Sequence, residues 1–127
     1  MPKKAMEYLT ESMFYVLMAF QIGPMCGIDV VNFIETWTQG RIQMGPATLY
    51  TILGKFEKEQ YILETAVEGR KRTYTITERG KEAYQQEMAR LHQCLDDATR
   101  LQKGEGVLWQ TQENERSDAF RPALTTT

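Results

Sequence analysis

The chain has 127 residues, 42% of them apolar, which is enough for one domain with its own hydrophobic core. Its formal net charge of −2 would exclude a general attraction to nucleic acid if the charges were evenly spread. They are not evenly spread. Residues 1–40 carry two basic and four acidic groups, and residues 82–127 carry five basic and eight acidic groups. Residues 41–81, in contrast, carry eight basic and five acidic groups. The middle of the chain is therefore basic, and we expect it to contact an anionic partner.

No membrane span, metal site or cofactor is expected. The apolar run 13–20 is too short to cross a bilayer. Cys26 and Cys94 are too few for a disulfide framework and fit no metal spacing, and His92 has no neighbours at ligand spacing. Such cysteine usage favours a reducing cytosol, so we expect a cytoplasmic protein.

Two helices are expected before residue 41. The first, over residues 9–20, is apolar nearly all round, which is typical of a helix buried against two partners. The second follows Gly27 over "IDVVNFIETW", with apolar residues at helical spacing until Gly40 breaks the pattern. The two apolar stripes are Leu9, Met13, Val16, Leu17 and Phe20, and Val30, Phe33, Ile34 and Trp37.

A third helix is expected to begin at Gly45-Pro46, because proline at the first helical position loses no hydrogen bond and its fixed φ suits a helix start. Its apolar stripe is Leu49, Ile52, Leu53 and Phe56. The opposite face is small, hydroxylic and basic, and consists of Ala47, Thr48, Thr51, Gly54, Lys55 and Lys58.

After Tyr61 the apolar period changes to two. The segments "ILETAVE" and "KRTYTIT" flank Gly69-Arg70 and predict a β-hairpin with a basic tip. Thr77 is a good N-cap for the last helix. Its apolar residues alternate four and three apart, as in a coiled-coil seam: Tyr84, Met88, Leu91, Leu95 and Ala98.

Three helices, a hairpin and a long helix predict a mainly α fold with a small β-hairpin. This order is that of a winged helix-turn-helix domain at residues 5–77, followed by a dimerisation helix at 78–103 and a polar tail at 104–127. In such a fold the third helix enters the DNA major groove and the hairpin follows the backbone. The predicted DNA-binding residues are Ala47, Thr48, Tyr50, Thr51, Lys55, Lys58, Arg70, Lys71 and Arg72.

The stretch "GPATLYTILGKFEKEQYI", followed by "EGRKRTYTITERGKEAY", resembles the signature of the PadR-type transcriptional regulators over roughly residues 8–102. The resemblance implies that Thr48-Leu49-Tyr50 belongs to the recognition helix and Gly69–Tyr74 to the wing. It further implies a homodimer through the last helix, formed by the seam residues from Tyr84 to Ala98, in the smaller subfamily with a single C-terminal helix.

The resemblance implies a regulator, often a repressor, that binds a palindromic operator and is released by a small hydrophobic or aromatic effector. In the multidrug-sensing branch a tryptophan of the dimer helix stacks on flat ligands, whereas Leu91 stands at that place here. No enzymatic activity is expected, because neighbouring helical residues such as Asp96 and Asp97 point about 100° apart and cannot share a reacting atom.

Two other functions remain open from the residues. A winged helix can bind protein instead of DNA, and salt-dependent duplex binding would separate these cases. Alternatively, the chain is a sensor of hydrophobic small molecules that binds DNA weakly, with the first and last helices lining a cavity between subunits. Loss of DNA binding on ligand addition would identify the sensor.

Overall fold

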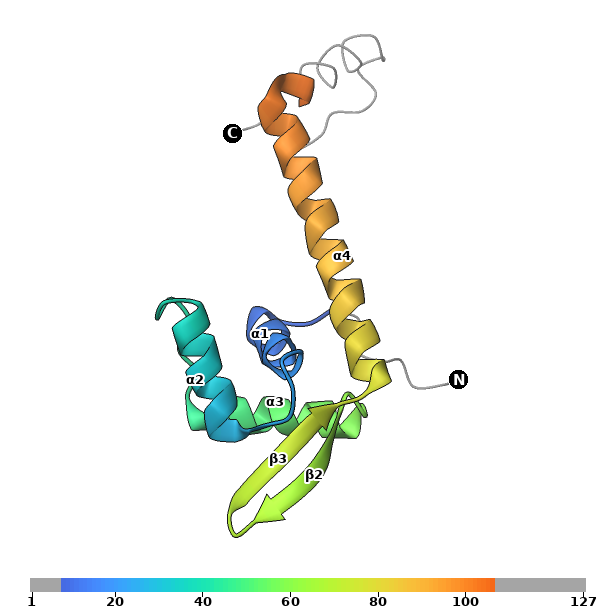
Figure 1. The fold of residues 1–127 in the computed structure, drawn as a ribbon. Coiled ribbons are helices and arrows are strands. Elements are labelled where there is room, and N and C mark those ends of the chain that lie inside the picture. Colours follow the sequence, from blue (N-terminus) through green and yellow to red (C-terminus); the bar gives the residue numbers. More distant parts are fainter. Residues whose placement is uncertain (1–7, 107–127) are drawn as a thin grey trace. The chain divides into compact units, whose positions relative to one another are not determined.

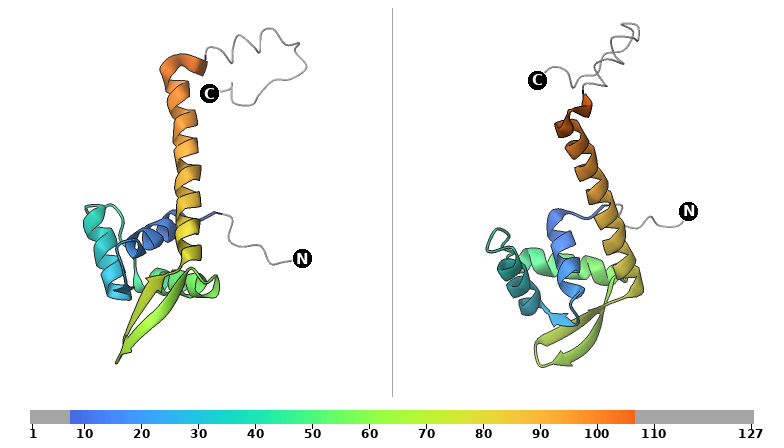
Figure 2. Two further views of the ribbon diagram at one scale, coloured as in Figure 1. Left: turned by 45° about the vertical axis from the view of Figure 1, so that its right-hand side comes forward. Right: turned by 45° about the horizontal axis from the view of Figure 1, so that its top comes forward.

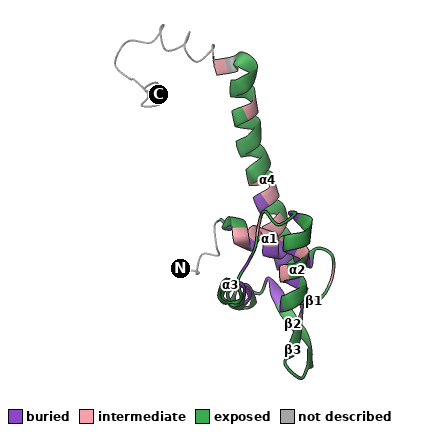
Figure 3. Ribbon diagram, turned by 90° about the vertical axis from the view of Figure 1, so that its left-hand side faces the viewer, coloured by how far each residue is buried: buried purple, intermediate pink, exposed green. Residues whose placement is uncertain are grey.

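The computed structural model describes residues 8–106. They form two compact units that meet between Met88 and Ala89, inside the last helix. The elements in chain order are α1 (Glu11–Phe20), β1 (Met25–Cys26), α2 (Gly27–Trp37), α3 (Pro46–Lys58), β2 (Ile62–Glu68), β3 (Lys71–Ile76), α4 (Glu78–Arg100) and a π-helical turn (Leu101–Glu105). Figure 1 labels the helices α1 to α4 and the strands β2 and β3, and Figure 3 also labels β1.

The helix starts are fixed by local hydrogen bonds and by proline. Thr10 caps α1, because its Oγ1 accepts a hydrogen bond from the backbone N–H of Met13 at 3.2 Å. At α2 the backbone N–H and the thiol of Cys26 donate to the Asp29 carboxylate at 3.4 and 3.2 Å. Helix α3 begins at Pro46 with Gly45 as its N-cap, as the sequence predicts.

The sheet has three antiparallel strands in the order β1-β3-β2. The β2–β3 hairpin confirms the prediction, and its turn contains Gly69 with φ of 62°, a conformation that glycine adopts without strain. A bulge between Glu64 and Ala66 shifts the register. Strand β1 was not predicted, since two residues carry no periodic pattern.

The core lies between α1, α2, α3 and the base of the hairpin, as Figures 2 and 3 show. The predicted stripe of α3 is fully buried, with exposures of 0–4% for Leu49, Ile52, Leu53 and Phe56. One expectation is wrong: Trp37 was placed on the apolar stripe of the second helix but is 68% exposed. It lies in the last turn of α2 and stacks on Phe33 with ring centroids 5.7 Å apart, not in the core.

The first turn of α4 packs closely against the end of α3. Thr77 caps α4 as predicted, since its Oγ1 accepts a hydrogen bond from the backbone N–H of Gly80 at 3.0 Å. The same hydroxyl donates to the Gln60 carbonyl at 2.6 Å. A Cβ on Gly80 would overlap the Tyr61 carbonyl oxygen, so glycine is required here for steric reasons.

The second unit begins at Ala89 and consists, as far as the structure describes it, of the remainder of α4 and the π-helical turn. The helix bends at Gly104, where φ is 97°. Leu95 and Leu101 are 62% and 66% exposed. Most of the predicted polar tail, residues 107–127, lies outside the described part of the chain.

Among residues 8–106, no helix combines the length and the apolar character that crossing a bilayer requires.

Candidate nucleic-acid interface

Five of the predicted recognition residues lie on one exposed side of α3, whereas Tyr50 borders a different hollow. Ala47, Thr48, Thr51, Lys55 and Lys58 are all exposed, which follows from the burial of the opposite stripe. A hollow of about 360 Å³ runs between α3 and the start of α1, where Ala47, Thr48, Thr51 and Lys55 face Thr10 and Ser12. Four hydroxyl-bearing side chains, three of threonine and one of serine, and one ammonium group therefore line this groove.

The wing carries the predicted basic tip. Arg70 lies in the turn of the hairpin, and Lys71 and Arg72 begin β3. Arg72 contacts the Glu64 carboxylate across the strands at 3.4 Å. Within residues 8–106, Arg70 and Lys71 form no ion pair, so both charges are available to an external anion.

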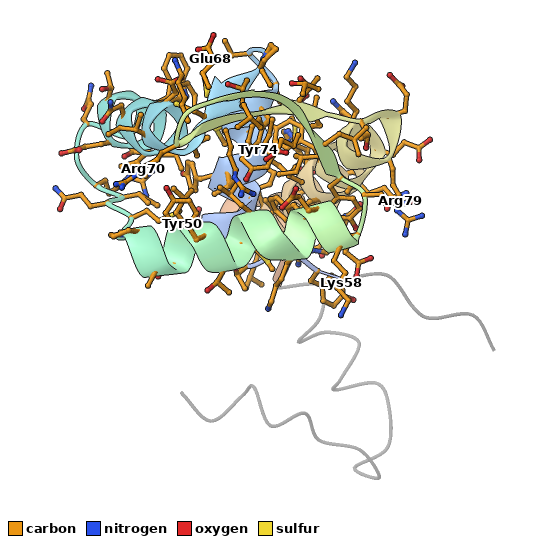
Figure 4. All side chains as sticks on the ribbon, turned by 90° about the horizontal axis from the view of Figure 1, so that it is seen from below. Tyr50, Lys58, Glu68, Arg70, Tyr74 and Arg79 are labelled. Atoms are coloured by element: carbon orange, nitrogen blue, oxygen red, sulfur yellow. The ribbon has the colours of Figure 1, made fainter. Side chains whose placement is uncertain are left out.

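A second, larger hollow of about 490 Å³ joins the wing to the helices. Its lining comes from three elements: Cys26, Gly27, Ile28 and Asp29 at the start of α2, Tyr50 of α3, and Arg70, Lys71, Arg72 and Tyr74 of the wing. In Figure 4, Tyr50 and Arg70 lie toward the same end of α3, and Lys58 lies toward the other.

The phenol of Tyr74 stays protonated at the floor of this hollow. Burial is the largest cause that raises its pKa above the usual value, and the nearby carboxylates of Glu57 and Glu64 raise it further. The guanidinium of Arg72 acts in the opposite direction. Tyr74 is 5% exposed and packs edge-on against Phe20 with centroids 6.5 Å apart, which ties the wing to the core.

The contribution of β1 and the start of α2 to this hollow is not predicted from the sequence. The pairing of Met25 with Tyr74 and of Cys26 with Thr73 brings the start of α2 beside the wing. The two strands are far apart in the sequence, and no local pattern predicts the contact. The residues in the described ranges hold no group of three or more His, Cys, Asp or Glu that could bind a metal ion, and Cys26 and Cys94 are both free thiols.

The predicted dimer residues divide between the two units. In the first, Tyr84 is half-buried and stacks on Phe14 of α1 with centroids 5.1 Å apart and an interplanar angle of 15°. Burial raises the pKa of its phenol, and Met88 is also half-buried. In the second unit, Leu91, Leu95 and Ala98 are exposed.

Three helices, a small antiparallel sheet with a projecting hairpin, and a following long helix define a winged helix-turn-helix fold. The sequence profile of the transcriptional regulator PadR-like family matches residues 16–86, more than half of the chain. The chain therefore belongs to the PadR-like family of transcriptional regulators, as its sequence motifs predict.

Solved structures with the same fold are remote in sequence. A transcriptional regulator from Clostridium thermocellum is 23% identical, with a TM-score of 0.63 over 69% of this chain and 89% of its own. RosR of H. salinarum is 16% identical, with a TM-score of 0.60 over 85% of this chain and 97% of its own. Bacillus subtilis PadR in complex with operator DNA is also 16% identical, with a TM-score of 0.54 over 91% and 85%. No curated protein sequence matched the chain.

Proposed function

We propose that this chain is a DNA-binding transcriptional repressor that acts as a homodimer on a palindromic operator. The observation that carries the proposal is that one domain exposes both a hydroxyl-bearing and basic side of α3 and a wing on which two cations, Arg70 and Lys71, have no ion pair within residues 8–106. Hydroxyl groups suit base edges and phosphates, and cations neutralise the DNA backbone. Residues 5–77 would form the DNA-binding domain.

The homodimer is proposed from the apolar stripe of α4 at residues 78–103. Leu91 and Leu95 are 39% and 62% exposed, and they repeat at coiled-coil spacing. A helix that leaves such a stripe in water gains stability by pairing with a second copy. A twofold dimer matches an operator with two half-sites, which is why we propose a palindrome.

Repression follows from the same proposal, because a dimer that covers promoter DNA obstructs the polymerase sterically. The proposal includes no enzymatic activity. It also includes a cytoplasmic location, where the protein would meet its DNA target. An effector is proposed to act at the aromatic surface formed by Phe14, Tyr15 and Tyr84, where rings stack at 5.1 Å and meet edge-on at 6.2 Å. A small hydrophobic or aromatic molecule would fit such a surface.

The test is a footprint on the promoter upstream of the gene that encodes this protein, combined with a salt titration of duplex affinity. The proposal predicts two protected half-sites about one or two helical turns apart and a steep fall of affinity with salt. Absence of duplex binding at low salt would favour a module that binds protein. Weak binding that a hydrophobic ligand abolishes would favour the sensor.

A further inference from the structure

The hollow beside the wing has an excess of positive charge. Arg70, Lys71 and Arg72 all line it, and of these three only Arg72 forms an ion pair within residues 8–106, with Glu64 at 3.4 Å. Asp29 is the one acid in the lining. Its carboxylate accepts the N–H and the thiol of Cys26 and so is held against the first turn of α2. The hollow therefore suits a single anionic group.

Tyr50 borders this hollow and not the groove between α3 and α1. Its neighbours on α3, Thr48 and Thr51, face the start of α1, whereas Tyr50 lines the hollow with the wing cations. The residue is 62% exposed, so its hydroxyl is accessible to a partner. The side chains of α3 thus diverge toward two different surfaces.

Gly27 lies beside Leu49 and Tyr50 of α3. A Cβ built on Gly27 would lie 3.5 Å from the Tyr50 hydroxyl oxygen, which is ordinary van der Waals contact, and 3.2 Å from Cδ2 of the buried Leu49, which is tighter. The Tyr50 hydroxyl is therefore close to the start of α2, and Tyr50 borders the same hollow as the wing cations.

We propose that this hollow binds one phosphate of the DNA backbone, and that Tyr50 donates a hydrogen bond to that phosphate instead of reading a base. Arg70 and Lys71 neutralise the phosphate, and the start of α2 at Gly27 lies beside the phenol. The inference rests on the proposed DNA binding. It changes the role expected for Tyr50 and adds the start of α2 to the interface.

The first test compares Tyr50→Phe with the parent on a duplex that the parent protein selects from a random pool and on a scrambled duplex. A phosphate contact predicts a loss of about ten-fold on both duplexes, with an unchanged ratio between them. Tyr8→Phe is the matched control, because Tyr8 is 65% exposed and lies outside the hollow, and it should bind like the parent.

The second test replaces single phosphates of the selected duplex by uncharged methylphosphonates. At one position in each half-site, the difference between the parent and Tyr50→Phe should vanish. The melting temperatures of Tyr50→Phe and its parent should stay equal, because the Tyr50 side chain is 62% exposed.

The outcomes separate this inference from the proposed function. If the parent binds duplexes and Tyr50→Phe binds equally well, or weakens only on the selected sequence, the phosphate contact is wrong and DNA binding stands. If no methylphosphonate position couples to Tyr50, the hollow does not bind phosphate. If the parent binds no duplex at any salt concentration, the proposed function fails and this inference with it.

Discussion

Helix α3 and the part of α4 after Met88 both carry an apolar stripe, but within residues 8–106 only the stripe of α3 is buried. On α3, Leu49 and Phe56 are 2% and 0% exposed. On α4, Leu95 follows Leu91 by four residues, which is also a helical spacing, but it is 62% exposed. The first stripe is part of the core of its own unit, and the proposed function assigns the opposite, polar side of α3 to DNA. It assigns the exposed stripe of α4 to a second copy of the chain.

Mutations on the two helices should therefore have different effects. Changes on the exposed side of α3 should affect a ligand and spare folding, since the stripe that holds the helix is on the other side. Changes on the exposed stripe of α4 should affect assembly.

The largest effect is expected from Leu91→Glu combined with Leu95→Glu. Two carboxylates on the stripe of α4 would have to be buried in a dimer, at a cost of several kcal/mol. Sedimentation should therefore show monomers or aggregates, and DNA affinity should fall because two half-sites are no longer bound together. Gln85→Glu with Gln86→Glu adds the same charge at exposed positions beside the stripe and should leave the assembly unchanged. A dimer that persists in the leucine variant would refute this interface.

Removing the charges of the wing comes next. Replacing Arg70, Lys71 and Arg72 by Ala should weaken binding to every duplex and reduce the slope of log affinity against log salt by about two to three units. The control replaces Lys81, Arg100 and Lys103 by Ala, which removes equal charge from α4 and the turn that follows it. If both triple variants change the slope equally, the wing makes no particular backbone contact.

Gly80→Ala tests the buried start of α4. An added Cβ would overlap the Tyr61 carbonyl oxygen and lie 2.8 Å from Ile76 Cγ1. Overpacking of this kind costs about 1–3 kcal/mol, against a gain in helix propensity of about 1 kcal/mol for replacing glycine. We expect a fall of several degrees in the melting temperature. Gly54→Ala on α3 is the control, because its Cβ meets open space and should raise the melting temperature slightly.

The elements with local signals were predictable from the sequence. Pro46 fixed the start of α3, the period of its stripe predicted the exposed side, and Thr77 marked the start of α4. Glycine at residue 69 with alternating flanks predicted the hairpin. These features depend on neighbouring residues, so a single sequence is sufficient to find them.

The remaining features depend on contacts between distant residues. The pairing of Cys26 with Thr73 creates the hollow beside the wing, and neither residue predicts the other. The helical period placed Trp37 with the core, but the core does not extend to the last turn of α2. The helical period predicts which side of a helix faces the core. How many turns of that side the core covers depends on the tertiary structure.

The smallest change, Thr51→Ala, tests the division most directly. Thr51 is exposed and lines the groove between α3 and α1 with Lys55. Loss of its hydroxyl should change the free energy of unfolding by no more than about 0.5 kcal/mol. A lost contact in the major groove typically costs about 1–3 kcal/mol of binding, and the loss should be greater for the selected duplex than for a scrambled one.

The matched control is Thr36→Ala, which removes a hydroxyl from an exposed position of α2 and should alter neither melting nor binding. A Thr51→Ala variant that melts like the parent but binds its selected duplex less tightly places this side of α3 in the groove. If affinity is intact, Thr51 makes no contact. If affinity is intact and the melting temperature falls by many degrees, this side of α3 is covered by the protein itself. The contrast with α4 would then be lost, because both helices would present surfaces that only protein covers.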